Sequence, residues 1–188
     1  QWALPLARRH FPERLAGVDA RAMARGVCKV QRSLIRVEAD EVTYNLHILV
    51  RVGLELALLR GQLEVADLPE AWNARYAEVV GVTPTDDVVG VLQDIHWSWG
   101  AIGYFGTYSL GNLYAAQLAE RMREDLDVES LVAAGELAPI LGWMRERIHQ
   151  KGQLLPTHEL MQEATGEALS HRPFMRYLEA KYGALYGL

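Results

Sequence analysis

The stretch that decides the fold class is residues 38–60, EADEVTYNLHILVRVGLELALLR. Its apolar residues recur at the spacing of an α-helix, and Gly61 follows it as a stop signal. We therefore expect one long helix from about residue 38 to residue 60. Apolar residues stand on most sides of this helix, which indicates that it is buried on most sides.

The rest of the chain supports the same fold class. Ala and Leu together supply 50 of the 188 residues and Ile only six, a composition that favours helix over strand. We find no alternating strand segment, and we expect an all-α protein: a single helical domain over residues 1–188 with about seven or eight helices. Besides 38–60, helices are expected at 19–29 with Asp19 as cap, from Asp67 as an acid cap to about 81, at 107–126, at 136–150, at 157–165, and from Pro173 onward, with 82–106 as a loop.

Composition excludes several classes of function. A formal net charge of −5 argues against a basic surface for nucleic acid or for an anionic membrane. The sequence has no run of 18 consecutive apolar residues, so no membrane-spanning helix is expected. Cys28 is the only cysteine, which excludes an internal disulfide and fits a reducing, cytoplasmic location. The start lacks a Met and a secretory signal, so we interpret the chain as cut from something longer.

A row of polar residues forms the first candidate site. If the helix begins near Arg36, then Arg36, Asp40, Tyr44, His47 and Arg51 are spaced 4, 4, 3 and 4 and share one face. An arginine held by a carboxylate can present its planar fork to a second carboxylate, such as one on a substrate. The alternative is a purely structural salt bridge that ties two helices together.

The glycine-punctuated segment 90–108 forms the second candidate site. It brings Gln93, Asp94, His96, Tyr104 and Tyr108 into one loop, and such loops on rigid scaffolds are frequent binding sites. His96 or a tyrosine hydroxyl could stabilise a developing oxyanion. The alternative is a buried aromatic loop whose polar tips satisfy one another.

No metal site is predicted. The nearest approach to a zinc-binding helix motif is residues 158–162, HELMQ, where Gln162 stands at the position that needs a second His. The segment is better explained as a helix start, with Thr157 as cap and Glu159 in the first turn.

Two motifs together resemble a known family. Residues 35–40 (IRVEAD) and 90–97 (GVLQDIHW) resemble two signature motifs of the thermostable (Taq-type) metallocarboxypeptidase family. The surrounding sequence agrees over essentially the whole chain, in order. Similar segments stand at 43–47 (TYNLH), 67–73 (DLPEAWN), 103–105 (GYF), 107–108 (TY), 110–112 (LGN), 115–117 (AAQ), 164–166 (ATG), 177–178 (YL) and 181–182 (KY).

The resemblance implies a helical zincin fold and a metal-dependent peptidase, a hydrolase that removes single residues from peptide C-termini, usually as a homodimer. It implies that Arg36 binds the terminal carboxylate and that His96 lies beside it. Tyr104 or Tyr108 would stabilise the tetrahedral intermediate, and the choice between them stays open. The supporting residues would be Asp40, Gln93 and Asp94.

The resemblance also shows what these residues lack. Family members use zinc or another divalent metal, held by an HExxH helix and a third ligand, and neither is found in this sequence. Gly53 also stands where the family commonly has Glu. We therefore expect the C-terminal, substrate-side part of a metallocarboxypeptidase, as a fragment, one piece of a split enzyme or a truncated paralogue, inactive alone. The expected partners are peptide C-termini in the full enzyme, and a second copy or a complementary N-terminal part. The alternative is a non-enzymatic helical module, a truncated paralogue that self-associates or binds a partner.

Overall fold

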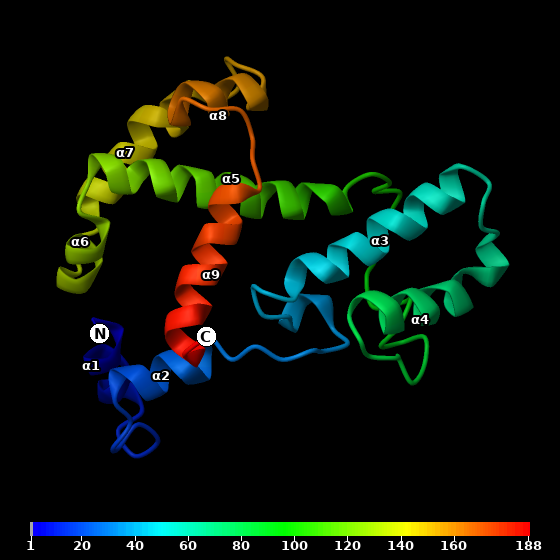
Figure 1. The fold of residues 1–188 in the computed structure, drawn as a ribbon, viewed down its shortest axis with the longest axis horizontal. Helices are drawn as coiled ribbons and strands as arrows, with labels where there is room; N and C mark the ends of the chain where they lie inside the picture. Colours follow the sequence, from blue (N-terminus) through cyan, green and yellow to red (C-terminus); the bar gives the residue numbers. More distant parts are fainter. Residues whose placement is uncertain (1) are drawn as a thin grey trace. The chain divides into compact units, whose positions relative to one another are not determined.

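The fold was analysed in a computed structural model that describes residues 2–188, and Figure 1 shows their helices. These residues form nine α-helices and three short 3₁₀ helices, without a β-strand, which confirms the all-α class. The chain divides into two compact units. One unit is Cys28–Gly111, and the other combines the chain up to Val27 with Asn112–Leu188. The expectation of a single domain over residues 1–188 stays a prediction.

The unit Cys28–Gly111 is built on two helices that lie side by side, α3 (Tyr44–Leu59) and α4 (Leu68–Val79) (Figure 1). Two 3₁₀ turns precede them, η1 (Arg36–Glu38) and η2 (Val65–Asp67), and the first residues of α5 (Phe105–Asp125) close the unit. Burial of apolar surface between α3 and α4 stabilises this unit, at about 25 cal/mol for each Å² buried. Its buried core residues are Val50, Leu54, Leu68, Trp72, Tyr76 and Val80.

Helix α3 begins later than the sequence pattern predicts. Asp40 stops the helix from extending backward, because its carboxylate accepts hydrogen bonds from the backbone N–H groups of Gln31, Val42 and Thr43 and from the Thr43 hydroxyl. Such side-chain bonds to nearby backbone groups compete with helix formation. The expected start near residue 38 is therefore wrong, and the helix begins at Tyr44.

The other unit contains α1 (Ala3–His10), α2 (Ala20–Val27), the rest of α5, α6 (Val128–Ala134), α7 (Ala138–Arg147), η3 (His149–Lys151), α8 (Thr157–Thr165) and α9 (Arg172–Tyr186). Gln117 on α5 is buried and binds the end of α8: its amide nitrogen donates to the Thr165 hydroxyl and to two backbone carbonyls beyond it. These hydrogen bonds fix the exit of α8 against α5.

Several helix ends match the signals expected from the sequence, but the caps expected at Asp67 and Thr157 do not form. The Asp19 carboxylate accepts from the N–H of Ala22, as expected, and Gly166 ends α8 in the left-handed conformation at φ 84°. The side chain of Asp67 makes no capping bond, and Pro156 rather than Thr157 is the cap residue of α8. Thr157 is the first helical residue, and no side chain caps the start of α8.

Two short helices were not expected from the sequence, α1 and α6. Helix α6 is only seven residues long, and its start depends on the Asp127 carboxylate, which accepts from the N–H of Ser130. The loop expected between α4 and α5 is confirmed, apart from Phe105 and Gly106, which belong to α5. Across residues 2–188, no helix has the length and apolar character needed to cross a membrane.

Candidate functional site

Arg36 occupies the 3₁₀ turn η1 and is almost fully buried. Its backbone N–H donates to Gln93 Oε1 at 3.0 Å. Its guanidinium donates from Nε and Nη2 to Asp94 Oδ1, at 3.1 and 2.7 Å, and from Nη1 to the Tyr44 hydroxyl at 2.9 Å. The backbone and the side chain of Arg36 are therefore both fixed by the loop that carries the second motif, 57 and 58 residues away in sequence.

Asp94 is shared between two arginines. Its Oδ1 binds Arg36, and its Oδ2 accepts from Arg51 Nε at 2.6 Å. Burial alone would raise the pKa of the Asp94 carboxyl, but the hydrogen bonds and charges of the two arginines outweigh burial and lower it. Two guanidinium groups facing one carboxylate leave a net formal charge of +1, so this buried cluster has a surplus positive charge.

Arg51 lies deeper than Arg36 and has most of its donors engaged. It is fully buried on α3, where Nη1 donates to the His47 carbonyl and to the Tyr76 hydroxyl, and Nη2 donates to Gln93 Oε1 at 2.8 Å. Its guanidinium carbon lies 4.7 Å from the ring centroid of Trp72, an arrangement that favours cation–π attraction. Arg51 is thus a structural part of the cluster, and it binds the Asp94 oxygen that Arg36 does not contact.

Gln93 connects the cluster to three backbone segments. Its Nε2 donates to the carbonyls of Leu34, Val89 and Gly90 at 2.9 to 3.2 Å, while its Oε1 accepts from Arg36 and Arg51. Every neighbour of the nitrogen is an acceptor and every neighbour of the oxygen is a donor. The amide orientation is therefore fixed by its surroundings.

His96 and Tyr108 form a second pair beside Arg36. The Nε2 of His96 lies 3.0 Å from the Tyr108 hydroxyl, and the Nδ1 lies 3.8 Å from Asp94 Oδ1 without a hydrogen bond among the residues described. The guanidinium of Arg36 lies 4.9 Å from the centroid of the Tyr108 ring. Tyr108 therefore touches both Arg36 and His96.

Tyr104 lies farther out. Its ring packs edge-on against Tyr108 at 5.4 Å, and about half of its surface is exposed. Its ring centroid is 5.8 Å from that of His96.

His47, on the inner face of α3, belongs to the hydrogen-bonded support. Its Nδ1 lies 2.9 Å from the Tyr76 hydroxyl, and its Nε2 is buried with no partner among the described residues. Burial, followed by the positive charges of Arg51 and Arg36, lowers the pKa of His47 to about 4. The imidazole is therefore neutral at physiological pH.

Glu55 supports the loop of the candidate site, and the sequence analysis missed it. It is buried on α3, accepts from the Trp97 indole N–H at 3.3 Å, and accepts from the Gly103 backbone N–H. These two bonds attach the loop between His96 and Tyr104 to α3. The available signal was a lone carboxylate in an otherwise apolar part of a helix, where a buried charge requires partners.

The structure brings together Arg36, Gln93, Asp94, His96 and Tyr108, and it places Tyr104 at their edge. The proposed helix face is wrong in its first half: residues before Tyr44 are not in α3. Asp40 makes none of its hydrogen bonds with Arg36 and instead supports the turn before α3. At Gly53, an added Cβ would meet only Arg75 atoms at 3.9 Å, so packing does not require a glycine there.

No metal centre is evident in the described part of the chain. Residues 2–188 contain no group of three or more His, Cys, Asp or Glu side chains that could hold a metal ion, and the His158 side chain is 77% exposed. These residues therefore do not fit a catalytic metal ion.

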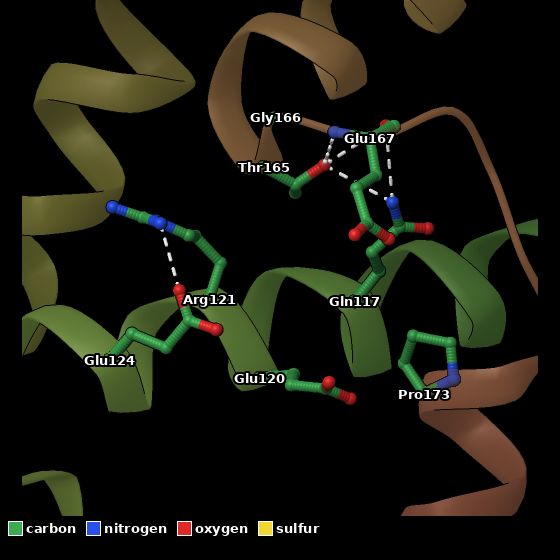
Figure 2. Close-up of a pocket in the computed structure, with 8 residues that line it drawn as sticks. All are labelled: Gln117, Glu120, Arg121, Glu124, Thr165, Gly166, Glu167 and Pro173. Atoms are coloured by element: carbon green, nitrogen blue, oxygen red, sulfur yellow. Dashed lines mark hydrogen bonds and ion pairs between the residues drawn. The ribbon is translucent and has the colours of Figure 1, made fainter.

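A polar pocket of about 290 Å³ lies in the other unit, between α5 and the ends of α8 and α9 (Figure 2). Some of its polar groups bind one another: Arg121 pairs with Glu124 at 2.8 Å, and the Gln117 amide binds Thr165. The pocket holds none of the residues predicted for the candidate site.

Comparison with known proteins identifies the family. The family model described as "Carboxypeptidase Taq (M32) metallopeptidase" matches residues 1–182. The chain is 53% identical over 184 residues to thermostable carboxypeptidase 1 of Thermus thermophilus, covering 97% of this chain and 36% of that protein. It is 41% identical over 176 residues to carboxypeptidase 1 of Bacillus subtilis, covering 93% of this chain and 35% of that protein.

Solved structures agree. The crystal structure of the M32 carboxypeptidase from Deinococcus radiodurans R1 matches 100% of this chain and 38% of its own, with a TM-score of 0.95 and 42% identity. The chain thus spans little more than a third of the length of the relatives it matches.

Proposed function

The chain belongs to the carboxypeptidase Taq (M32) metallopeptidase family, and from this premise we propose that its 188 residues form the substrate-side part of a metal-dependent carboxypeptidase. In this proposal, they bind the free C-terminal end of a peptide, from which the complete enzyme releases single amino acids.

The observation that carries the proposal is the surplus positive charge at Arg36. A guanidinium has five N–H bonds, and residues of the described chain accept three of those of Arg36. Two N–H groups are left for a ligand, in a cluster with a net formal charge of +1. A peptide carboxylate supplies the matching charge and acceptors.

His96 and Tyr108 are proposed to act on the scissile carbonyl. In this arrangement His96 Nε2 donates to the Tyr108 oxygen, and the Tyr108 hydroxyl donates to the oxyanion that forms when this carbonyl is attacked; such a donor is most effective when it is preorganised. The 3.0 Å contact between them and the stacking of Arg36 on Tyr108 supply that preorganisation. Between the two tyrosines, this contact favours Tyr108, with Tyr104 as the second candidate. Gln93 and Asp94 are positioning residues, and Asp40 supports the turn that precedes α3.

The metal, zinc or another divalent ion, is proposed to be held by residues outside these 188. We derive no catalytic step through it, because the side chains described here do not form a site for it. We propose that the chain on its own does not hydrolyse peptides. An assay of the purified chain with added zinc and an amino-blocked dipeptide should release no C-terminal amino acid. Stoichiometric zinc binding together with release would contradict this.

Carboxylate binding is the first direct test. In an NMR titration, the purified chain should bind N-acetyl-alanyl-alanine about tenfold or more tightly than the corresponding C-terminal amide, since a hydrogen bond to a charged group contributes about 1.5–3 kcal/mol. Arg36→Met should remove this preference. Arg75→Met, an exposed arginine paired with Glu78, is the matched control. Equal binding of acid and amide by the unmodified chain would exclude the proposed role of Arg36.

The remaining expectations also stay predictions: a zincin-type fold for the whole enzyme, a homodimer and a cytoplasmic location.

The competing function, a non-enzymatic interaction module, is favoured by one observation. Large apolar side chains of α3 are exposed, including Leu49 and Leu59 at 58% and 65%. Preference for a peptide carboxylate over its amide distinguishes the two functions, because a module that only binds proteins needs no such discrimination.

A further inference from the structure

The loop of the candidate site has two separate anchors. The first is Gln93, whose amide nitrogen binds three backbone carbonyls and whose oxygen accepts from the Arg36 backbone N–H. The second is Glu55 on α3, whose buried carboxylate accepts from the Trp97 indole and from the Gly103 N–H. Among the described residues, Glu55 makes no hydrogen bond with Gln93 or Arg36. The two anchors therefore act on different parts of the loop.

Glu55 binds both ends of residues 97–103, one with each carboxylate oxygen. Its Oε2 accepts from the indole of Trp97 at 3.3 Å, and Trp97 directly follows His96. Its Oε1 accepts from the backbone N–H of Gly103. Because one carboxylate supplies both acceptors, the two ends of this segment are held at a fixed separation.

The contact between His96 and Tyr108, at 3.0 Å, joins these two ends. Tyr108 lies at the start of α5, where the Tyr104 carbonyl accepts from the backbone N–H and the hydroxyl of Thr107 at 3.0 and 2.6 Å. Glu55 therefore fixes the residue after His96 at one end and the entry to α5 at the other.

The middle of the segment 97–103 is open to solvent. Trp99 and Ile102 are 79% and 51% exposed, and Gly100 turns the backbone with a φ of 80°. Segments with few buried contacts are the ones that open most easily. The position of this segment therefore depends mainly on its two ends, which Glu55 binds.

We propose that Glu55 is a positioning residue for His96 and Tyr108, and that it does not contribute to carboxylate binding by Arg36. The inference rests on the proposed function, in which this pair acts on the scissile carbonyl. A small displacement of groups that act on reacting atoms lowers turnover strongly, whereas the Arg36 cluster keeps its own anchor. The ring of Phe105 packs on His96 at 4.4 Å between centroids, so loss of Glu55 should displace the pair without unfolding the loop.

The first experiment uses the chain alone and needs no ligand. The imidazole nitrogen NMR signals of His96 report its contact with Tyr108, and Tyr108→Phe gives the shift that follows when this contact is lost. Glu55→Ala should reproduce most of that shift. Glu55→Gln, which keeps one acceptor oxygen, should give a smaller one.

The control for a general loss of stability is Leu68→Ala, a truncation in the core of the same unit. It should leave the His96 signals unchanged. Unchanged His96 signals in Glu55→Ala would overturn the proposal. A shift of equal size in Leu68→Ala would also overturn it, because Glu55 would then only support the core.

The second experiment separates binding from turnover. In the chain alone, Glu55→Ala should keep the preference for N-acetyl-alanyl-alanine over its amide, which Arg36→Met removes. In a chimera of the Deinococcus radiodurans carboxypeptidase, with its matched region replaced by this chain, Glu55→Ala should lower kcat roughly 10–100-fold. KM should change little, as for an interaction that matters in the transition state.

Two results would contradict the proposed role of Glu55: loss of the acid preference in Glu55→Ala, or an unchanged kcat in the chimera. The failure of the proposed function gives a different result. In that case the unmodified chain shows no preference for the acid or the unmodified chimera is inactive, and the His96 signals still decide whether Glu55 positions the pair.

Discussion

Two carboxylates in this molecule, Asp94 and Asp125, each bind two arginines, but the two clusters differ in their exposure to solvent. Asp94 binds Arg36 and Arg51, and the side chain is 8% exposed. Asp125, on α5 in the other unit, binds Arg121 and Arg147 and also accepts from the Trp143 indole, but its side chain is 23% exposed and both of its arginines are more than a third exposed. The lowered pKa of Asp125 comes first from the Trp143 hydrogen bond and not from burial.

The difference shows that the composition of an ion-pair cluster does not determine its role. In the exposed cluster, water and salt compensate each charge, so the pairs contribute little. In the buried cluster, each charge depends on its partner, and removal of one partner leaves the other charge buried without compensation. Four experiments test this comparison.

The largest effect is expected at the shared carboxylates. Asp94→Asn leaves two buried guanidinium groups without their counter-charge and should lower the free energy of unfolding by about 3–5 kcal/mol. Asp125→Asn is the matched control, and it should cost much less because its arginines are solvated. Urea unfolding measures both losses, and hydrogen exchange assigns each loss to Cys28–Gly111 or to the other unit. Equal losses would remove the distinction between the clusters.

The next effect is a pH dependence specific to the buried site. The pKa of His47 is about 4 in the folded chain, against 6.5 ordinarily, so between these values the unfolded chain binds more protons. Stability therefore falls as pH falls from about 6.5 to 4, by about 3 kcal/mol in total. Asp94, whose pKa is lowered, loses its contribution only at still lower pH.

His47→Gln should flatten the stability profile in this pH range, with His158→Gln as the exposed-histidine control. Urea midpoints measured at steps between pH 4 and 7 check it. An unchanged slope in the His47 variant would show that another group titrates with unfolding.

A smaller effect is expected at Glu55. Glu55→Ala removes the acceptor for the Trp97 indole and the Gly103 N–H, and should cost about 2 kcal/mol, as for hydrogen bonds to a charged group. Hydrogen exchange should accelerate in the loop between His96 and Tyr104 before it does so in α4. Exposed Glu78→Ala serves as control. Uniform acceleration across the unit would mean that Glu55 supports the core in general and not this loop.

The smallest effect is expected for the exposed pair of Arg176 and Glu120, whose side chains are 56% and 42% exposed. Arg176→Ala should change the free energy of unfolding by about 0.5 kcal/mol or less, as is usual for surface ion pairs. High salt should reduce the difference further, which urea midpoints at low and high NaCl measure. A loss comparable to that of Asp94→Asn would show that exposure does not explain the difference between the buried cluster and the surface ion pairs.

The sequence predicted the features of the fold that depend on neighbouring residues. The Asp19 cap and the stop at Gly166 are signals of a few residues, and they were read correctly. The start of α3 was missed because Asp40 binds backbone groups on both sides of it, including Gln31 nine residues earlier. The spacing of apolar residues does not reveal a side chain that competes with the helix for backbone N–H groups.

The candidate site shows the same division. Arg36 and the segment from Gln93 to His96 were recognised as motifs, but their pairing joins residues 57 and 58 apart in sequence, and only the folded chain shows that Asp94 is shared with Arg51. Glu55 was missed because its partners, an indole and a backbone N–H, leave no pattern in the sequence. The proposal that favours Tyr108 over Tyr104 likewise rests on the contact of Tyr108 with His96, which the sequence does not show.

Gln93 has one further consequence for the buried cluster. Its amide nitrogen faces three carbonyl oxygens while its oxygen faces two arginines, so the side chain joins five groups without adding any charge of its own. A glutamate has nearly the same shape, but it would cancel the cluster's excess of +1 and set an anion against those carbonyls. Replacing one nitrogen atom with oxygen would thus remove the surplus charge on which the proposed binding of a carboxylate depends.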